Sequence, residues 1–346
     1  MTSPIYLNQL GIVCALGADI ATVRTALFSE TLHDSVPVDG RHLGAVDCPL
    51  ADINILAPAL HTRNNALLLT ALAQIRPAVD AAIDRYGAQR VGVVLGTSTS
   101  GIGESETAIA HHMQHGVLPA WFHISQQEMG SPAMAISSLL GLAGPSMVVS
   151  TACSSSAKAM MSAARMLRAG LLDTVITGGM DALCGFTVAG FSALESVSSS
   201  RCNPFSVNRC GINIGEGGAL FLMTREPGPV RLAGWGESSD AHHISAPAPD
   251  GRGALASMQQ ALQRGAIAPA AIDYINLHGT ATPQNDAMES RVVHELFDMQ
   301  PPASSTKPLT GHTLGGAGAL EAAFCWLCLT ENEGGKLPPH WWDGES

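Results

Sequence analysis

The sequence contains few charged and few aromatic residues. Only 14% of its 346 residues are charged and 5% are aromatic, and the formal net charge is −11. No basic run offsets this acidic balance, so the composition excludes general affinity for nucleic acids. An acidic partner would need a local basic patch, because the overall field of the protein repels it.

Long apolar runs and an export signal are also absent. No stretch of about 18 uninterrupted apolar residues occurs, and the segment from Met1 to Leu7 carries no positive charge. The eight cysteines are scattered among mostly apolar or small neighbours, at positions 14, 48, 153, 184, 202, 210, 325 and 328. We therefore expect no membrane span, reduced thiols and a cytoplasmic protein.

What is present indicates a large α/β enzyme: 46% hydrophobic residues and 36 glycines. Short apolar segments alternate with segments of helical spacing, which predicts layers with largely parallel sheets. We expect strands at 10–17, 91–95, 147–150, 174–179, 218–223 and 274–277, and helices at 64–86, 126–141, 154–170, 257–264, 286–297 and 315–329. A boundary near Pro227-Gly228-Pro229 would separate a half of residues 1–226 from a shorter half of residues 227–346.

Cys153 follows a segment typical of a buried strand and precedes a segment typical of a helix. It is therefore expected on a tight turn at a helix N-terminus, where unpaired N–H groups and the helix dipole favour a thiolate. A lone cysteine is more often a small buried hydrophobe. We nevertheless identify Cys153 as a nucleophile, because two histidine motifs downstream supply partners for it.

His278 lies in Asn276-Leu-His-Gly-Thr-Ala-Thr282, and His312 lies in Lys307-Pro-Leu-Thr-Gly-His-Thr-Leu-Gly-Gly316. A single histidine beside a glycine is usually structural. A cysteine at a helix start, two such histidines, and a nearby Lys307 and Glu321 form a rarer set. They supply a thiolate, donors for a developing oxyanion or enolate, and a charge pair, which are the parts of thioester chemistry.

At five places the sequence resembles the β-ketoacyl-acyl-carrier-protein synthases of the thiolase superfamily. These places are Thr151-Ala-Cys-Ser-Ser155, Asn203-Pro-Phe-Ser-Val-Asn-Arg209, Gly215-Glu-Gly-Gly218, His278-Gly-Thr-Ala-Thr-Pro283 and Lys307 to Glu321. The resemblance implies a thiolase-like layered α-β-α-β-α fold built from two pseudo-repeated halves, the second of them truncated. It also implies decarboxylative Claisen condensation of a malonyl unit with a cysteine-bound acyl chain, in fatty-acid or polyketide-type biosynthesis.

The resemblance assigns the roles residue by residue. Cys153 would carry the acyl group, His278 and His312 would stabilise the enolate, and Lys307 would pair with Glu321. No cofactor and no metal are implied. The implied partners are acyl- and malonyl-loaded acyl carrier protein and a second subunit, in a homodimer or a heterodimer. Four residues are expected to bind substrate and one to dock the carrier protein: Thr280, Thr282, Gly315 and Gly316, and Arg63.

Two departures from the family pattern leave a second reading open. Ser206 stands where the family has an aspartate, and Cys210 stands where the family has a second aspartate. The family's last strand and its Asn-Ser-Phe-Gly-Phe-Gly-Gly loop are missing after Pro339, which predicts an exposed edge on the second-half sheet that a partner covers.

The alternative function is that of a helper subunit like a chain-length factor. Such factors generally lack the cysteine, so Cys153 favours the enzyme. A thiolase fits less well. Thiolases deprotonate their substrate through a second cysteine near the C-terminus, and the nearest candidates here, Cys325 and Cys328, fall inside an expected helix.

The remaining candidate sites are weaker. His111 and His115 are one helical turn apart and could hold a metal, but a solvated helix face explains them better because no third ligand is in register. Cys325 and Cys328 form a single CxxC pair in an apolar setting, which is more often part of a core than a redox or zinc site.

Overall fold

The computed structural model describes residues 3–32, 40–243, 245–298 and 301–345. Its centre is a six-stranded sheet of order β3-β2-β4-β5-β1-β6. β2 (Val91–Gly96) runs parallel to β3 (Ser146–Val149) and β4 (Thr174–Asp181). β5 (Gly217–Thr224) is antiparallel to β4 and to β1 (Tyr6–Cys14), and β6 (Val230–Arg231) is antiparallel to β1.

Three of the five strand pairings in this sheet are antiparallel, so the prediction of largely parallel sheets was wrong for it. β4 ends at Asp181 and β5 begins opposite it, since Asp181 pairs with Gly217. The intervening chain stays at that end of the sheet instead of crossing back over it, so β5 must run in the opposite direction. α6 (Gly185–Ala193) lies within this connection.

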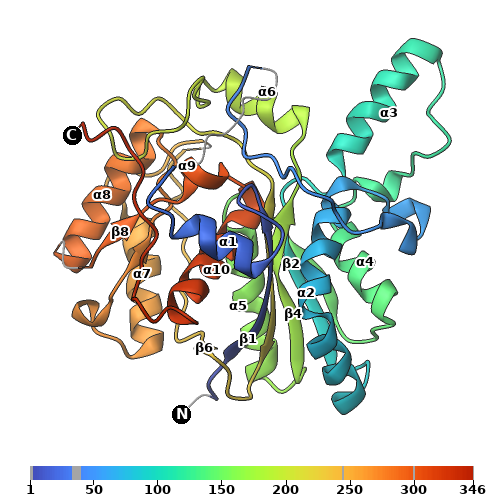
Figure 1. The fold of residues 1–346 in the computed structure, drawn as a ribbon, viewed down its shortest axis with the longest axis horizontal. Coiled ribbons are helices and arrows are strands. Elements are labelled where there is room, and N and C mark those ends of the chain that lie inside the picture. Colours follow the sequence, from blue (N-terminus) through green and yellow to red (C-terminus); the bar gives the residue numbers. More distant parts are fainter. Residues whose placement is uncertain (1–2, 33–39, 244, 299–300, 346) are drawn as a thin grey trace.

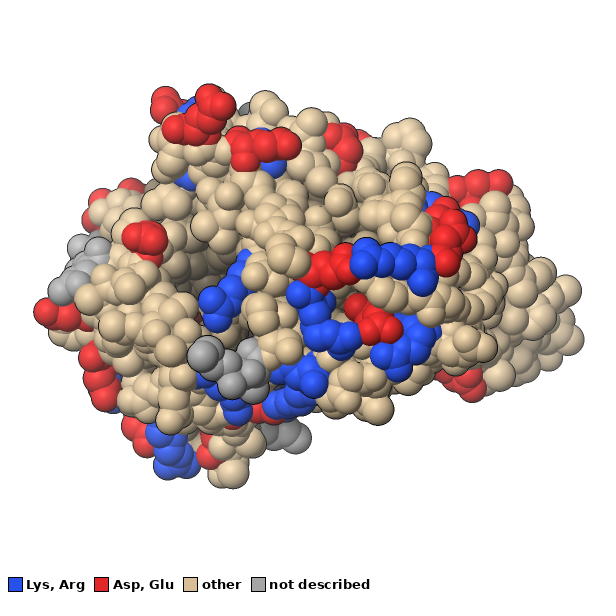
Figure 2. All heavy atoms as spheres, turned by 90° about the horizontal axis from the view of Figure 1, so that it is seen from below, with Lys and Arg blue, Asp and Glu red and all other residues tan. Residues whose placement is uncertain are grey.

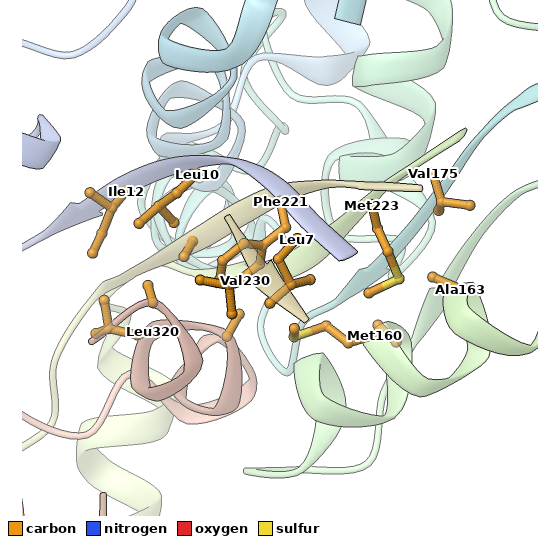
Figure 3. Packing of buried hydrophobic residues seen from close by; sticks show 14 of the residues in the cluster. Leu7, Leu10, Ile12, Met160, Ala163, Val175, Phe221, Met223, Val230 and Leu320 are labelled. Atoms are coloured by element: carbon orange, nitrogen blue, oxygen red, sulfur yellow. The ribbon is translucent and has the colours of Figure 1, made fainter. Parts of the chain in front are cut away.

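Helices cover both faces of the sheet, which gives the layers that the sequence predicted (Figure 1). α2 (Arg63–Tyr86) and α4 (Ser131–Leu140) pack on one face, and α1 (Ile20–Leu27), α5 (Ser155–Arg168) and α10 (Ala317–Leu329) pack on the other. Successive residues of β5 alternate between the two cores: Phe221 and Met223 face Met160 of α5, whereas Leu220 and Leu222 face α2 (Figure 3).

The rest of the chain forms a smaller second layer. β7 (Ile275–Asn276) and β8 (Ala303–Ser304) make a two-stranded parallel sheet, flanked by α7 (Arg252–Gly265) and α8 (Pro283–Phe297). α9 (Lys307–Thr310) leads from β8 toward α10. The division at residue 227 stays a prediction. The short strand β6 follows that point in the sequence but still belongs to the first sheet.

Several predicted elements differ in extent. The predicted helix at 126–141 is a short 3-10 turn at Ile124–Gln126 followed by α4, whose first turn contains Pro132. α3 (Ile102–His115) was not predicted and projects from the body (Figure 1). The segment at 147–150 was predicted as a buried strand, but β3 is an edge strand, and Met147 is 39% exposed.

Within the described part of the chain, one helix, α2, is long and apolar enough to cross a membrane by length and composition alone. Its apolar side chains, including Leu67, Leu68, Leu72 and Ile75, are buried in the core against β1 and β5. A long helix packed on a sheet in this way belongs to the interior of a globular domain.

Candidate active site

The chain makes a sharp turn between β3 and α5, and Cys153 lies at its apex. Ala152 adopts a left-handed conformation with φ of +53°. The hydroxyl of Ser155 holds the turn closed, because it accepts the N–H of Thr151 at 2.8 Å and donates to the carbonyl of Ala152 at 2.6 Å. The strand-turn-helix setting predicted for the cysteine is therefore confirmed.

The first turn of α5 lies unusually close to the sheet. A Cβ on Gly96, at the end of β2, would lie 2.2 Å from the backbone nitrogen of Ser156. Only glycine permits this approach. The Ser156 hydroxyl accepts the N–H of Ala319 at 2.8 Å, which ties the start of α5 to α10. These contacts fix the position of Cys153 relative to the second half of the chain.

His312 faces the cysteine directly. Its Nε2 lies 2.9 Å from the Sγ of Cys153. The backbone of His312 is held in a strand-like pairing, since its N–H donates to Asn213 and its carbonyl accepts from Gly215. Its Nδ1 is buried and has no hydrogen-bond partner among the described residues.

His278 completes the cluster from the other layer. Its ring is perpendicular to that of His312, with 5.2 Å between the centroids. The carboxylate of Glu289, on α8, accepts the backbone N–H groups of His278 at 2.7 Å and of Gly279 at 2.8 Å. This buried carboxylate sets the turn that follows β7 and aims the imidazole at Cys153. The sequence reading missed Glu289, although its spacing of three residues from Asp286 on one helix was visible.

Lys307 and Glu321 form an ion pair beside the histidines. The Lys307 Nζ lies 2.5 Å from a Glu321 oxygen, and the Lys307 side chain is only 4% exposed. A buried ammonium must be paired, because leaving either charge alone is strongly destabilising. The predicted pair is therefore present. The positive charge of Lys307 lies close enough to change the pKa of Cys153, His278 and His312.

Burial dominates the protonation of the cluster. It raises the pKa of the Cys153 thiol to about 11, and Lys307 opposes that change. Burial, together with Lys307, lowers the pKa of His278 to about 3 and that of His312 well below its usual range. We expected the helix N-terminus to favour a thiolate, but desolvation outweighs that effect. At neutral pH the free site holds a thiol beside two neutral imidazoles.

A second buried carboxylate, on Asp181 at the end of β4, ties three segments together. It accepts hydrogen bonds from Thr97, Ser98 and Thr99 of the loop after β2, and from the N–H of Gly315 at 2.6 Å. This network fixes the chain just after His312. Asp181 also escaped the sequence reading, because nothing in a single strand-end aspartate distinguishes it.

The other predicted site residues have mixed outcomes. The hydroxyls of Thr280 and Thr282 lie 3.0 Å apart on the turn after His278, within the same site. Gly315 and Gly316 are buried, and a Cβ on either would lie within 2.7 Å of a neighbouring atom. They permit close packing, and substrate binding by these four residues stays a prediction.

The structure gives Arg63 a different role from carrier docking. Its guanidinium forms a two-fold contact with Glu216, whose side chain is 1% exposed, and it also donates to the carbonyl of Val46. The guanidinium therefore neutralises a buried carboxylate. Docking of a carrier by Arg63 stays a prediction that this contact disfavours.

Other basic side chains gather on the underside of the molecule, several of them beside acidic ones (Figure 2). Asp173 pairs with Arg90 and Arg225, next to the residues where β2 and β4 begin. Cys153 lies near the opposite end of these strands. This face is therefore badly placed to bring a tethered substrate to the thiol.

The described residues include one cluster with the donor atoms for a metal: the atoms of Cys153, His278 and His312 lie within 4.8 Å of one another. His111 and His115 stack at 4.4 Å on the projecting α3, and no third ligand joins them among the described residues. The first set can equally perform nucleophilic chemistry, since a thiol in contact with an imidazole is an activated nucleophile.

The fold is a layered α/β fold that brings Cys153, His278 and His312 together, and the comparisons identify the family to which it belongs. Residues 65–227 match the family model for the β-ketoacyl synthase N-terminal domain, and residues 230–340 match its C-terminal domain. The chain belongs to the β-ketoacyl synthase family.

Individual relatives support this assignment. The chain is 33% identical to 3-oxoacyl-[acyl-carrier-protein] synthase 2 of Staphylococcus aureus over 271 residues, 72% of this chain and 67% of that protein. It is 36% identical to the mitochondrial 3-oxoacyl-[acyl-carrier-protein] synthase of Arabidopsis thaliana over 56% of this chain and 47% of that protein. The matched part therefore spans between about half and two thirds of these curated relatives.

A solved structure is also similar over nearly the whole chain. It is that of the ketosynthase ApeO in complex with its chain length factor ApeC from Xenorhabdus doucetiae. The similarity has a TM-score of 0.90 and 44% identity, and it covers 95% of this chain and 85% of that one. The layered thiolase-like fold that the resemblance implied is confirmed.

The protonation of Cys153 can be tested by its alkylation rate. Because the thiolate reacts and the thiol does not, a pKa near 11 predicts that the rate of iodoacetamide modification rises steadily from pH 7 to 9 without a plateau. Replacing Lys307 with Met removes a positive charge that lowers this pKa, so Lys307→Met should slow the reaction at each pH. Peptide mass spectrometry separates Cys153 from the exposed Cys210.

The control is Lys336→Met, which removes a charge from an exposed position outside the site. It should leave the profile unchanged. A plateau below pH 7 in the unmodified protein would show that Cys153 rests as a thiolate and would contradict this description.

Proposed function

We propose that this chain is a β-ketoacyl-acyl-carrier-protein synthase that joins a malonyl unit to an acyl chain held on Cys153. The observation that carries the proposal is the 2.9 Å contact between the Cys153 Sγ and the His312 Nε2, with the His278 ring beside it. The names of the relatives from Staphylococcus and Arabidopsis support the carrier-bound substrate. No cofactor is needed for this chemistry.

The first half-reaction loads the cysteine. The thiol proton passes to His312 Nε2 as the sulfur attacks the thioester carbonyl of an acyl carrier protein. The carbon–sulfur bond to the carrier then breaks, and the released carrier thiolate takes the proton back. A neutral imidazole can accept this proton, which agrees with the lowered pKa of His312.

The second half-reaction extends the chain. The carbon–carbon bond to the malonyl carboxylate breaks, CO₂ leaves, and the electron pair moves into an enolate at the thioester oxygen. Each neutral imidazole donates a ring N–H to that oxygen, a type of contribution worth about 3–4 kcal/mol per donor. For His312 this step uses the tautomer with the proton on Nε2, whereas loading uses the tautomer in which Nε2 is free to accept. The carbanion attacks the acyl thioester on Cys153, and the sulfur leaves as thiolate. Thr280 and Thr282 would hold the arm that carries the malonyl group.

The β3 edge of the six-stranded sheet supports a partner subunit as part of this proposal; it is a different edge from the one predicted on the second-half sheet, which stays a prediction. Among the residues that the structure describes, β3 pairs with β2 alone, so its outer edge is available to continue the sheet. Apolar side chains accompany this edge strand and α6: Met147 is 39% exposed, Phe186 65% and Leu194 56%. Large exposed apolar residues of this kind mark interaction surfaces. We propose a second ketosynthase-like subunit here, in a homodimer or a heterodimer, within the cytoplasm.

A non-catalytic helper subunit is the second candidate, since the structure at 44% identity is a complex that contains a chain length factor. The two candidates differ in what the cysteine does. An enzyme uses Cys153 as an acyl acceptor, whereas a helper would leave the contacting Cys153 and His312 idle.

Acyl transfer and condensation should separate among variants. Incubation with acyl-loaded carrier protein should add one acyl group to the intact protein, and Cys153→Ala should abolish this adduct. His278→Ala should keep the adduct but lower the condensation rate with malonyl carrier by about 10²–10³, because one donor to the enolate is lost. Intact-protein mass spectrometry and product assay measure the two steps. An adduct that persists in Cys153→Ala would refute the assignment of the nucleophile.

The partner surface can be tested at β3. Met147→Arg places a charge on the edge strand, and edge charges block strand pairing. The variant should weaken subunit association by at least about tenfold, measured by sedimentation or light scattering. Leu171→Arg is the control, because Leu171 is 59% exposed and lies at the other end of α5 from Cys153. Equal effects of the two substitutions would show that β3 is not the interface.

A further inference from the structure

Residues 338–345 cross the loop of residues 203–208 and fasten it to the second layer. The Pro338 carbonyl accepts a hydrogen bond from the hydroxyl of Ser304, at the end of β8. Further along, the Asp343 carboxylate accepts from the side-chain amides of Asn203 at 2.6 Å and Asn208 at 2.9 Å. We refer to residues 338–345 as the strap.

His340 occupies the middle of the strap and contacts both sides. Its Nδ1 accepts the backbone N–H of Ser305 at 3.2 Å, and its Nε2 bonds the carbonyl of Pro204 at 3.2 Å. Its ring also lies 5.9 Å from that of Phe205 and 5.8 Å from that of Trp342. Only a neutral imidazole with its proton on Nε2 makes both hydrogen bonds at once.

Ser305 and Phe205, two of the residues that His340 contacts, enclose the turn after His278. The Ser305 hydroxyl donates to the carbonyl of Gly279 and accepts the N–H of Lys307. A Cβ on Gly279 would lie 2.5 Å from the Ser305 Cβ and 3.0 Å from the Phe205 ring. There is thus a short chain of contacts from His340 through Ser305 to the backbones of Gly279 and Lys307.

We propose that His340 is a positioning residue for the condensation step. It holds Ser305 and Phe205 against the turn of His278, and so sets the His278 imidazole at the distance that the enolate requires. The Lys307 ammonium is held in place by Glu321. Cys153 and His312 are anchored separately, through Ser155, Asn213 and Asp181. His340 therefore acts on the condensation half of the site and leaves the loading half unaffected. This inference rests on the proposed function.

The test compares three substitutions of one residue. His340→Ala removes both hydrogen bonds. His340→Asn keeps an acceptor at the position of Nδ1, facing the Ser305 N–H. His340→Gln keeps a donor at the position of Nε2, facing the Pro204 carbonyl. His294→Ala is the matched control, since His294 is an exposed histidine on α8. Each protein is assayed for acyl loading of Cys153 and, separately, for condensation with malonyl carrier.

His340→Ala should lower the condensation kcat at least about tenfold, because small misplacements of catalytic groups have effects of this size or larger. The loading rate should stay within about twofold of the parent rate, since the loading residues do not move. His340→Asn should recover most of the lost kcat, and His340→Gln should not. Thermal unfolding of all variants shows whether each one is folded.

Equal losses of loading and condensation in His340→Ala would overturn the proposal, as would equal behaviour of the Asn and Gln variants, because both results indicate general support of the fold. An unchanged condensation kcat would overturn it too. A parent protein that loads no acyl group would instead refute the proposed function, so the two failures are distinct.

Discussion

The buried ion pair of Lys307 and Glu321 is the interaction on which the site depends. An ammonium that is 4% exposed must keep its carboxylate, since losing one partner of a buried pair costs about 3–5 kcal/mol. Because that positive charge cannot leave, it lowers the pKa of both imidazoles and partly offsets the rise that burial imposes on the thiol. Burial, with this charge as the second cause, keeps His278 and His312 neutral, the state in which they donate to an enolate or accept the thiol proton.

Buried carboxylates perform most of the positioning in this low-charge chain. Glu289 accepts the backbone N–H groups of His278 and Gly279, Asp181 accepts that of Gly315, and Asp286 accepts that of Phe205. Each ties a loop to a helix or strand, so the reactive side chains come from loops but behave as parts of a rigid framework. Charged residues are scarce in this chain, and the acidic side chains that hold the site are buried, where they accept hydrogen bonds from backbone N–H groups.

The sequence predicted the nucleophile, both histidines, the lysine–glutamate pair and most strands and helices, because each lies in a local pattern. Cys153 follows an apolar run and precedes a helix, and the histidine motifs carry characteristic glycines and threonines.

The sequence could not predict features that depend on pairing between residues far apart in the chain. The direction of β5 relative to β4 depends on the path of the connection between them. The position of the strand before Cys153, central or at the edge, depends on which strands pair with it. A local stretch of sequence contains neither. Asp181, Glu289 and His340 were missed because their partners lie 10 to 136 residues away in the sequence and many of them are backbone groups. The protonation of Cys153 was missed because burial outweighs the helix dipole.

The central claim is that desolvation around one buried charge holds a neutral thiol and two neutral imidazoles in contact. The most direct measurement is the nitrogen chemical shift of the ring atoms of His278 and His312 in ¹⁵N-labelled protein, followed from pH 8 to pH 5, with single His→Ala variants for assignment. The structure predicts that both rings remain neutral throughout this range, since burial lowers both pKa values far below it. An imidazolium at neutral pH, and with it a thiolate on Cys153, would contradict the account.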